Sequence, residues 1–195
     1  RKHHRLSRRS DLKTLLDNII LHNLNPKLIV EHKLSYAQEV INLDKLKEEY
    51  CVEIFEKDKY PTTSFSIEEI EKCKLTILSY GYLSSVANKV ISEFMYDYEV
   101  SIQNIVPSKL YPFNYRTLID SIKNTKNLVI IEEGTHDYGF GSEISAYINE
   151  NYSNYLDNPV KRIASSVDII PSSKILESKT ITNEEQIKKE LLIFC

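Results

Sequence analysis

The segment Leu128–Ile131 is an unbroken run of large aliphatic residues in the second half of the chain. Such a run is typical of a central strand in a parallel sheet, because that strand is buried on both faces. Apolar residues recur at helical spacing on either side of it, at 83–94 and from Ser142 onward. Strands that alternate with helices favour crossover connections within one sheet. We therefore predict an α/β fold: a three-layer open mostly parallel sheet with helices on both faces.

The same alternation gives the remaining elements of the second half. The predicted strands lie at 75–79, 100–106, 128–131 and 160–164, and the predicted helices lie at 83–94, 115–123, from 142 and after 182. Thr182 and Glu185 have the spacing of a capping box at the start of the last helix.

The chain before residue 74 has a different character. Ser10 is a candidate N-cap for a helix with apolar residues to Ile20, and 27–32 reads as a short strand. Residues 34–73 are rich in Lys, Glu and Tyr without sustained periodicity. Ser66 and Glu69 there suggest a brief helical turn. We interpret this stretch as a linker that crosses the surface.

Charge and cysteine content narrow the class of protein. The net charge is −3, which gives no reason to expect nucleic acid, although five of the 25 basic residues fall in the first nine positions. Such a tail can bind polyanions, but we interpret it as a solvated or cut chain end. Its adjacent His3 and His4 are weak evidence for a metal. No stretch reaches the ~20 apolar residues of a membrane span. Three cysteines without a CxxC pair fit a reducing compartment, so we expect a cytoplasmic protein, or a mitochondrial matrix protein in a eukaryote.

Three of the four glycines gather in one loop, 134–141. Glycines there let the backbone approach a ligand closely, and the helix that follows presents free N–H groups to an anion. The same glycines also suit a tight strand-to-helix turn, and the spacing matches neither GxGxxG nor a P-loop. The candidates for an interface or ligand edge are Glu132, Glu133, Gly134, His136, Asp137, Gly139, Phe140, Gly141 and Ser142.

The polar candidates do not form a complete catalytic set. Glu132 and Glu133 are neighbours in a strand and point to opposite faces, so one is expected to cap the next helix or to pair across a domain interface. His136 and Asp137 have no evident Ser or Cys nucleophile beside them. We predict no catalytic, cofactor-binding or metal-binding residue in this chain.

The central segment resembles a known family. The run LVIIEEG at 128–134, followed by GFGSEI at 139–144, looks like the hallmark of the transketolase C-terminal domain. Further segments match that domain in order, at 75–81, 105–112 and 158–163. Residues 171–177 make the chain most similar to the beta subunit of pyruvate dehydrogenase. Upstream, 11–16 and 25–33 resemble the end of the pyrimidine-binding domain that precedes it.

The resemblance implies three parts. Residues 1–35 would be the remnant of a pyrimidine-binding domain, 36–73 a linker, and 74–195 the transketolase C-terminal-like domain. The parent enzyme would use thiamine diphosphate and magnesium, neither of which we expect to bind to this fragment. The fragment would be inactive alone and would serve subunit interfaces and partner docking in the beta subunit of a 2-oxoacid dehydrogenase. The expected partners are the alpha subunit, a second beta subunit and the dihydrolipoyl acyltransferase, the last docking at Phe194 and Cys195.

Two other functions remain open from the sequence. The chain could be a free-standing interaction or anion-binding module with the same fold. It could also belong to a carbon–carbon transferase similar to transketolase or deoxyxylulose-phosphate synthase.

Overall fold

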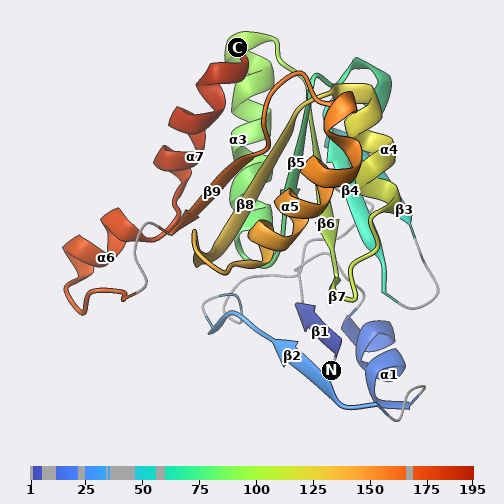
Figure 1. Cartoon of the computed structure of the whole chain (residues 1–195), viewed down its shortest axis with the longest axis vertical. Coiled ribbons are helices and arrows are strands. Elements are labelled where there is room, and N and C mark those ends of the chain that lie inside the picture. The colour runs from blue at the N-terminus through green and yellow to red at the C-terminus, as the bar shows by residue number, and fades with distance from the viewer. Residues whose placement is uncertain are drawn as a thin grey trace.

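The computed structural model describes residues 2–5, 12–21, 25–33, 35, 47–55, 60–165 and 169–195, with only the backbone given for 2–5, 12–15 and 18. A six-stranded sheet forms its centre (Figure 1). In spatial order its strands are β3 (Cys51–Phe55), β4 (Thr62–Ser66), β6 (Ile102–Pro107), β5 (Leu75–Ser79), β8 (Leu128–Thr135) and β9 (Lys161–Ser165).

The last four strands in this order are mutually parallel, and β3 and β4 add an antiparallel edge. β8 lies between β5 and β9, with Val129 opposite Ile77 and Ile131 opposite Ile163. The central position explains the aliphatic run, because both faces of β8 are covered and Leu128–Ile131 are buried. The predicted α/β class and mostly parallel sheet are confirmed.

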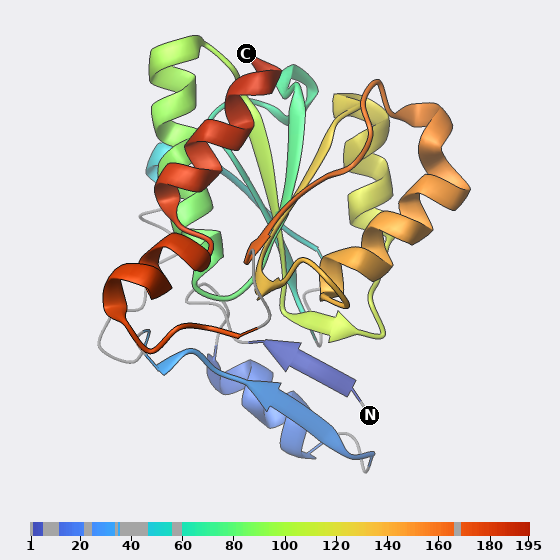
Figure 2. The ribbon, with the colours of Figure 1, turned by 60° about the vertical axis from the view of Figure 1, so that its left-hand side comes forward.

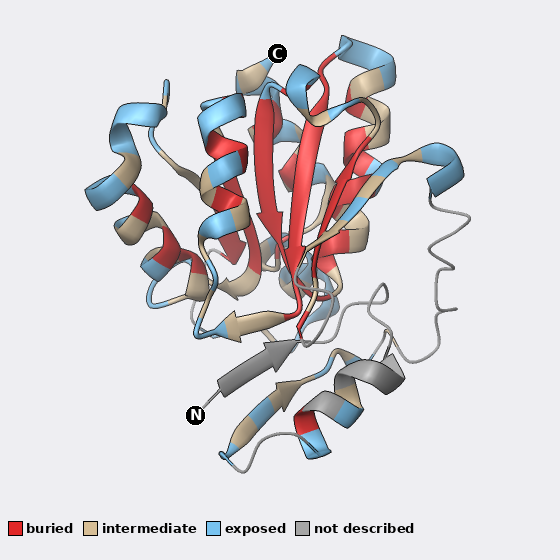
Figure 3. Cartoon of the chain, turned by 90° about the vertical axis from the view of Figure 1, so that its right-hand side faces the viewer, coloured by how far each residue is buried: buried red, intermediate tan, exposed pale blue. Residues whose placement is uncertain are grey.

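Helices cover both faces of the sheet, which makes three layers (Figure 2). One core lies under α3 (Leu83–Tyr98) and α7 (Glu184–Leu191), the other under α4 (Arg116–Thr125) and α5 (Phe140–Tyr152). Ile187 and Leu191 fix α7 to the first core, and Ile144 and Ile148 fix α5 to the second. Removing any one of these fully buried side chains would cost about 2–5 kcal/mol. Figure 3 shows the buried strands enclosed between the two helical layers.

The interpretation of 36–73 as a linker was wrong where the structure describes it. Residues 51–55 and 62–66 form β3 and β4, and every residue of β4 is buried. Phe65 packs with Val106 beneath Tyr50 and Val52, which gives this edge of the sheet a small core of its own. Serine and threonine fill most of β4, so the sequence lacked the apolar alternation that predicts a strand.

A second, three-stranded sheet lies beneath the carboxyl ends of the main strands (Figure 1). In this sheet β1 (Lys2–Arg5) pairs in parallel with β2 (Lys27–Val30) and antiparallel with β7 (Lys109–Tyr111). Along the chain, α1 (Leu12–Leu21) comes between β1 and β2. The sequence did not predict a strand in the basic tail, yet residues 2–5 form one. Their backbones hydrogen-bond to strands on both sides, which the charge pattern concealed.

Helix starts were only partly predicted. Asn183, rather than Thr182, caps α7 by accepting the Gln186 N–H at 2.9 Å, while the Thr182 hydroxyl donates to the Glu132 carbonyl at 3.1 Å. Ser66 belongs to β4 and donates to the Glu68 carbonyl, and the turn after it is η2 (Ile70–Lys72). Ser10 lies outside the described residues.

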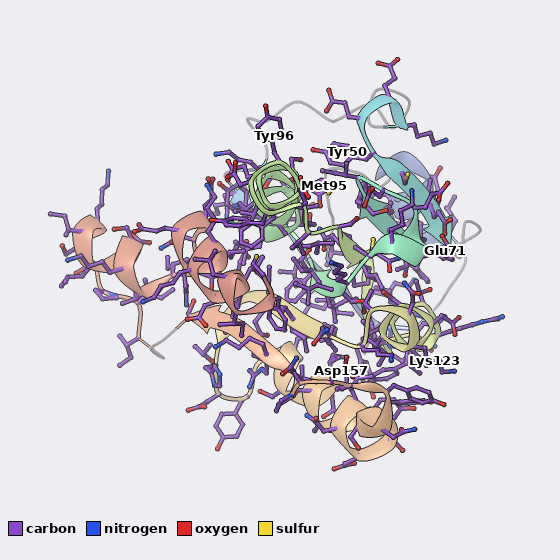
Figure 4. All side chains as sticks on the ribbon, turned by 90° about the horizontal axis from the view of Figure 1, so that it is seen from above. Tyr50, Glu71, Met95, Tyr96, Lys123 and Asp157 are labelled. Carbon is purple, nitrogen blue, oxygen red and sulfur yellow. The ribbon has the colours of Figure 1, made fainter. Side chains whose placement is uncertain are left out.

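Three elements complete the fold: η3 (Ser153–Tyr155), η4 (Leu192–Phe194) and α6 (Lys174–Thr180), which the sequence did not predict as a helix. Seen from above, α6 projects away from the three layers (Figure 4). The labelled residues Met95, Lys123 and Asp157 belong to the three-layered part of the molecule. Among the described residues, no helix combines the length and the apolar character that crossing a bilayer requires.

Candidate functional site

The glycine loop connects the end of β8 to the start of α5 at the carboxyl edge of the main sheet (Figure 2). In open α/β sheets this edge is where ligands and partner surfaces gather. The loop lies beside the segment 110–115, above the small sheet built on β1, β2 and β7 (Figure 1). The predicted edge residues are therefore grouped in space, but they differ in what they contact.

Glu132 is fully buried and is held on all sides. Its Oε1 accepts from Arg162 Nη2 at 3.0 Å, and its Oε2 accepts from the Gly141 N–H at 3.0 Å and from the Tyr80 hydroxyl at 3.4 Å. The opposite charge of Arg162 compensates for the cost of burying the carboxylate, and the hydrogen bonds satisfy both of its oxygens. This group joins β8, β9 and the first turn of α5.

The volume of that carboxylate requires a glycine at position 141, and the carboxylate together with the Thr135 backbone requires one at position 139. A Cβ on Gly141 would lie 2.5 Å from Glu132 Oε1, and one on Gly139 would lie 2.7 Å from Oε2 and 2.5 Å from the Thr135 carbonyl oxygen. A Cβ on Gly134 would make only an ordinary contact of 3.6 Å. The N–H that a bound anion would use at the start of α5 is donated to Glu132 instead. The two glycines therefore serve the turn and its buried acid.

Glu133 points to the other face, as the alternation of a strand requires. Its Oε1 lies 3.8 Å from His32 Nε2, in the segment that follows β2. The His32 ring stacks on Tyr82 at 5.0 Å between centroids, with 12° between the planes. Glu133 thus takes part in the contact between the upstream segment and the main sheet.

His136 and Asp137 are exposed on the outside of the loop. His136 Nδ1 lies 3.9 Å from Asp137 Oδ1, and the Ser142 hydroxyl donates to the His136 carbonyl at 3.3 Å. The Thr135 hydroxyl donates to the Asp137 carbonyl at 2.6 Å, which stabilises the turn. These groups organise a surface loop and are available for contact with another molecule.

Phe140 is the first residue of α5, and its ring packs against other aromatic rings rather than against the polar groups of the loop. Its ring lies 5.3 Å from Tyr80 and 5.6 Å from Phe113, both in edge-to-face geometry. The aromatic side of the loop therefore continues into the segment that follows β7.

Phe194 and Cys195 lie at the opposite end of the sheet from the glycine loop (Figure 1). Phe194 is half-buried against the core under α3 and α7, and Cys195 is exposed. Partial burial raises the pKa of the Cys195 thiol, so the thiol is protonated at neutral pH. The two predicted contact regions are thus separate surfaces.

At the glycine loop, two groups that could contact a diphosphate are already engaged within the chain. Arg162 neutralises Glu132, and Glu132 in turn takes the Gly141 N–H that a diphosphate would need. Within the described ranges, no three His, Cys, Asp or Glu side chains are grouped to hold a metal ion. The side chains of His3 and His4 lie outside the described atoms.

Sequence reasoning missed Arg162 and Thr182, which both contact Glu132. A signal for Arg162 was present, because a basic residue within a short buried strand requires an acidic partner on a neighbouring strand. Thr182 gave no comparable signal, since a threonine before a helix suggests a cap.

Comparisons with known proteins agree on one family. The family described as transketolase, C-terminal domain, matches residues 67–187. The chloroplastic pyruvate dehydrogenase E1 component subunit beta-2 of Arabidopsis thaliana is 32% identical over 172 residues, covering 84% of this chain and 37% of the relative. The pyruvate dehydrogenase E1 component subunit beta of Gracilaria tenuistipitata var. liui is 29% identical over 183 residues, covering 90% of this chain and 50% of the relative.

A solved structure gives the same fold. A split-gene transketolase described as an inactive beta4 tetramer superposes with a TM-score of 0.69, covering 98% of this chain and 57% of that chain. Its sequence identity is 16%, so the likeness concerns the fold alone. The chain spans between 37% and 50% of the length of the two beta subunits above.

Proposed function

Since the chain belongs to the family of transketolase C-terminal domains, we propose that it serves the beta subunit of a 2-oxoacid dehydrogenase of the pyruvate type. Its role there is to form subunit interfaces and to dock partners. In such an enzyme thiamine diphosphate supplies the chemistry of decarboxylation. The names of the two similar beta subunits and their coverage of 84% and 90% of this chain support the assignment. The partners are an alpha subunit, a second beta subunit and a dihydrolipoyl acyltransferase.

One observation carries the interface role, namely the exposed apolar surface around α6. Although α6 lies wholly within the described chain, it buries none of its residues. Ile175 is 70% exposed and Leu176 is 52% exposed, and Ile169 and Ile170 just before the helix are also exposed. An apolar surface of this kind on a projecting helix fits an interface with another subunit.

The test compares two surface variants in sedimentation velocity with the cognate alpha subunit. We expect the unmodified chain to form a complex and the double variant Ile175→Ser/Leu176→Ser to bind about tenfold more weakly or worse. Ile193→Ser is the matched control, because Ile193 is 67% exposed but lies at the other end of the molecule. Equal binding by the double variant, or equal weakening by the control, would contradict the α6 interface.

A second measurement addresses the reaction itself. We expect calorimetry to show no binding of thiamine diphosphate and magnesium to the chain alone, since Glu132 and Arg162 beside the glycine loop already neutralise each other. Saturable binding in the micromolar range would show that the chain holds a cofactor site and would overturn the proposed division of roles.

The docking of the acyltransferase is proposed for Phe194 and Cys195. Phe194→Ala combined with Cys195→Ser should reduce capture of the acyltransferase while leaving alpha-subunit binding unchanged. Loss of both interactions together would instead indicate that the α7 end of the domain had unfolded.

A further inference from the structure

A large aromatic cavity lies between the segment after β7 and the start of α5. Its volume is about 830 Å³, and Val30 of β2 contributes to one side. This size is within the range of small-molecule sites, roughly 300–1,000 Å³. Half of its twelve lining residues are aromatic: Tyr111, Phe113, Tyr115, Tyr138, Phe140 and Tyr147.

Four of the six aromatic rings are fixed by their contacts with one another. Phe113 lies edge-to-face against Tyr115 at 4.9 Å and against Phe140 at 5.6 Å between centroids. The Tyr115 ring lies 3.8 Å from that of Tyr147 with 32° between the planes. Because these four rings hold one another, this part of the wall is formed before any ligand arrives.

The charge of the cavity has one sign. Among its lining residues, all within the described chain, only Glu143 is charged. Burial raises the pKa of the Tyr115 phenol, and the negative charge of Glu143 raises that pKa further. The carboxylate therefore acts electrostatically on the wall. Aromatic faces also carry negative potential, so the cavity favours a cation with an apolar surface.

The mouth of the cavity carries a strained and exposed tyrosine. Tyr138 is fully exposed and has φ of 56°, in the left-handed region that bulky side chains rarely adopt. Such backbone conformations gather at ligand-binding and switch segments. This backbone conformation places the Tyr138 ring, the sixth aromatic ring of the cavity, at the entrance. Packing within the chain does not require the ring there, because it is fully exposed.

We propose that this cavity binds a small organic ammonium ion, with its methylated or alkylated nitrogen against the aromatic wall and its charge balanced by Glu143. An aromatic cage with one carboxylate is the arrangement that recognises quaternary ammonium groups. The proposal is independent of the interface role of α6, because it concerns a different surface and a different ligand.

The test uses choline as the probe and 3,3-dimethylbutan-1-ol, its uncharged carbon isostere, as the control ligand. Calorimetry or ligand-observed NMR should show saturable choline binding with Kd on the order of 1 mM or tighter, and the isostere should bind at least about tenfold more weakly. The absence of saturation at tens of millimolar choline would overturn the proposal, as would equal affinity for the two ligands.

Two variants locate the site on the cavity. Glu143→Gln and Tyr147→Leu should each weaken choline binding by about tenfold. Glu150→Gln is the matched control, since Glu150 is an exposed carboxylate two turns further along α5 and outside the lining. Because Glu143 is exposed, its variant keeps the fold even if Tyr147→Leu does not. Unchanged affinity in Glu143→Gln, or an equal loss in Glu150→Gln, would remove the assignment to this cavity.

Discussion

At the residue scale, Glu132 determines the sequence of the loop that follows it. Its carboxylate is held by Arg162 from β9, and it occupies the space that side chains at positions 139 and 141 would need. The local pattern of glycines after an apolar run was enough to predict the strand-to-helix turn. It did not predict the ion pair, because Glu132 and Arg162 are 30 residues apart and meet only when β8 and β9 pair.

Replacing Gly141 tests this account. Gly141→Ala would place a Cβ 2.5 Å from Glu132 Oε1, and the ion pair with Arg162 prevents the carboxylate from moving away. We expect the free energy of unfolding to fall by about 1–3 kcal/mol. Chemical denaturation measures the change. Gly134→Ala is the control, since its Cβ would lie 3.6 Å from the same carboxylate and should change stability by less than about 0.5 kcal/mol. Equal stability of the two variants would show that Glu132 does not require the glycine.

At the element scale, α7 is attached to α3 by ionic contacts as well as by its apolar face. Lys188 pairs with Glu184 at 2.8 Å and also with Glu93, and Lys89 of α3 pairs with Glu184 at 2.9 Å. The hydrogen bonds from Lys188 and Lys89 lower the pKa of Glu184, and the hydrogen bonds to Glu184 and Glu93 raise the pKa of Lys188.

Glu184 should therefore make stability depend on pH in the acidic range. Because its folded pKa lies below the usual 4.5, its contribution is present above about pH 4.5 and is lost as the pH falls through the lower, folded value. Glu184→Gln should lower stability at pH 7 by less than about 1 kcal/mol, as is usual for exposed pairs. The thermal unfolding temperatures of the two proteins should converge as the pH falls below the folded pKa of Glu184. Glu185→Gln, one residue further along the same turn, is the control, and its stability should show no pH-dependent difference of this kind from the unmodified protein. A pH-independent difference for Glu184→Gln would contradict the ionic contact.

The elements that the sequence predicted well are those with sustained periodicity. α3, α4, α5 and the four parallel strands carry apolar residues at regular spacing, and they form close to the predicted positions. β3 and β4 were missed because their pairing is not local and because β4 buries hydroxyl groups. Gln103 of β6 donates to the Ser64 hydroxyl at 2.7 Å, which satisfies one of these groups. Such a partner cannot be identified before the register of the sheet is known.

At the scale of the whole molecule, the folded unit is larger than the matched family segment. That segment starts at residue 67, after β3 and β4, yet β4 pairs along β6 from Thr62 to Phe65. A chain cut at residue 67 would leave the buried strand β6 as an open edge and would lose Phe65 from the core. Open apolar edges promote association between chains.

Two truncations test this extent. Residues 67–195 should be recovered mostly as aggregates, whereas residues 47–195, which keep β3 and β4, should remain dispersed and unfold cooperatively. Size-exclusion chromatography with light scattering distinguishes the two outcomes. A dispersed and equally stable 67–195 would show that the antiparallel edge is an accessory to the domain.

The ion pair between Glu132 and Arg162 also has an evolutionary consequence. The buried acid sets the requirements at Arg162 and Gly141, so these three positions should change together. A lineage that replaces the acid with a small apolar residue releases Gly141 and the arginine from selection, whereas Gly139 stays constrained by the Thr135 carbonyl oxygen. A lineage that keeps the acid can vary the exposed His136 and Asp137 freely. Related sequences should therefore show linked substitution at Glu132, Arg162 and Gly141, and independent substitution at the two exposed positions.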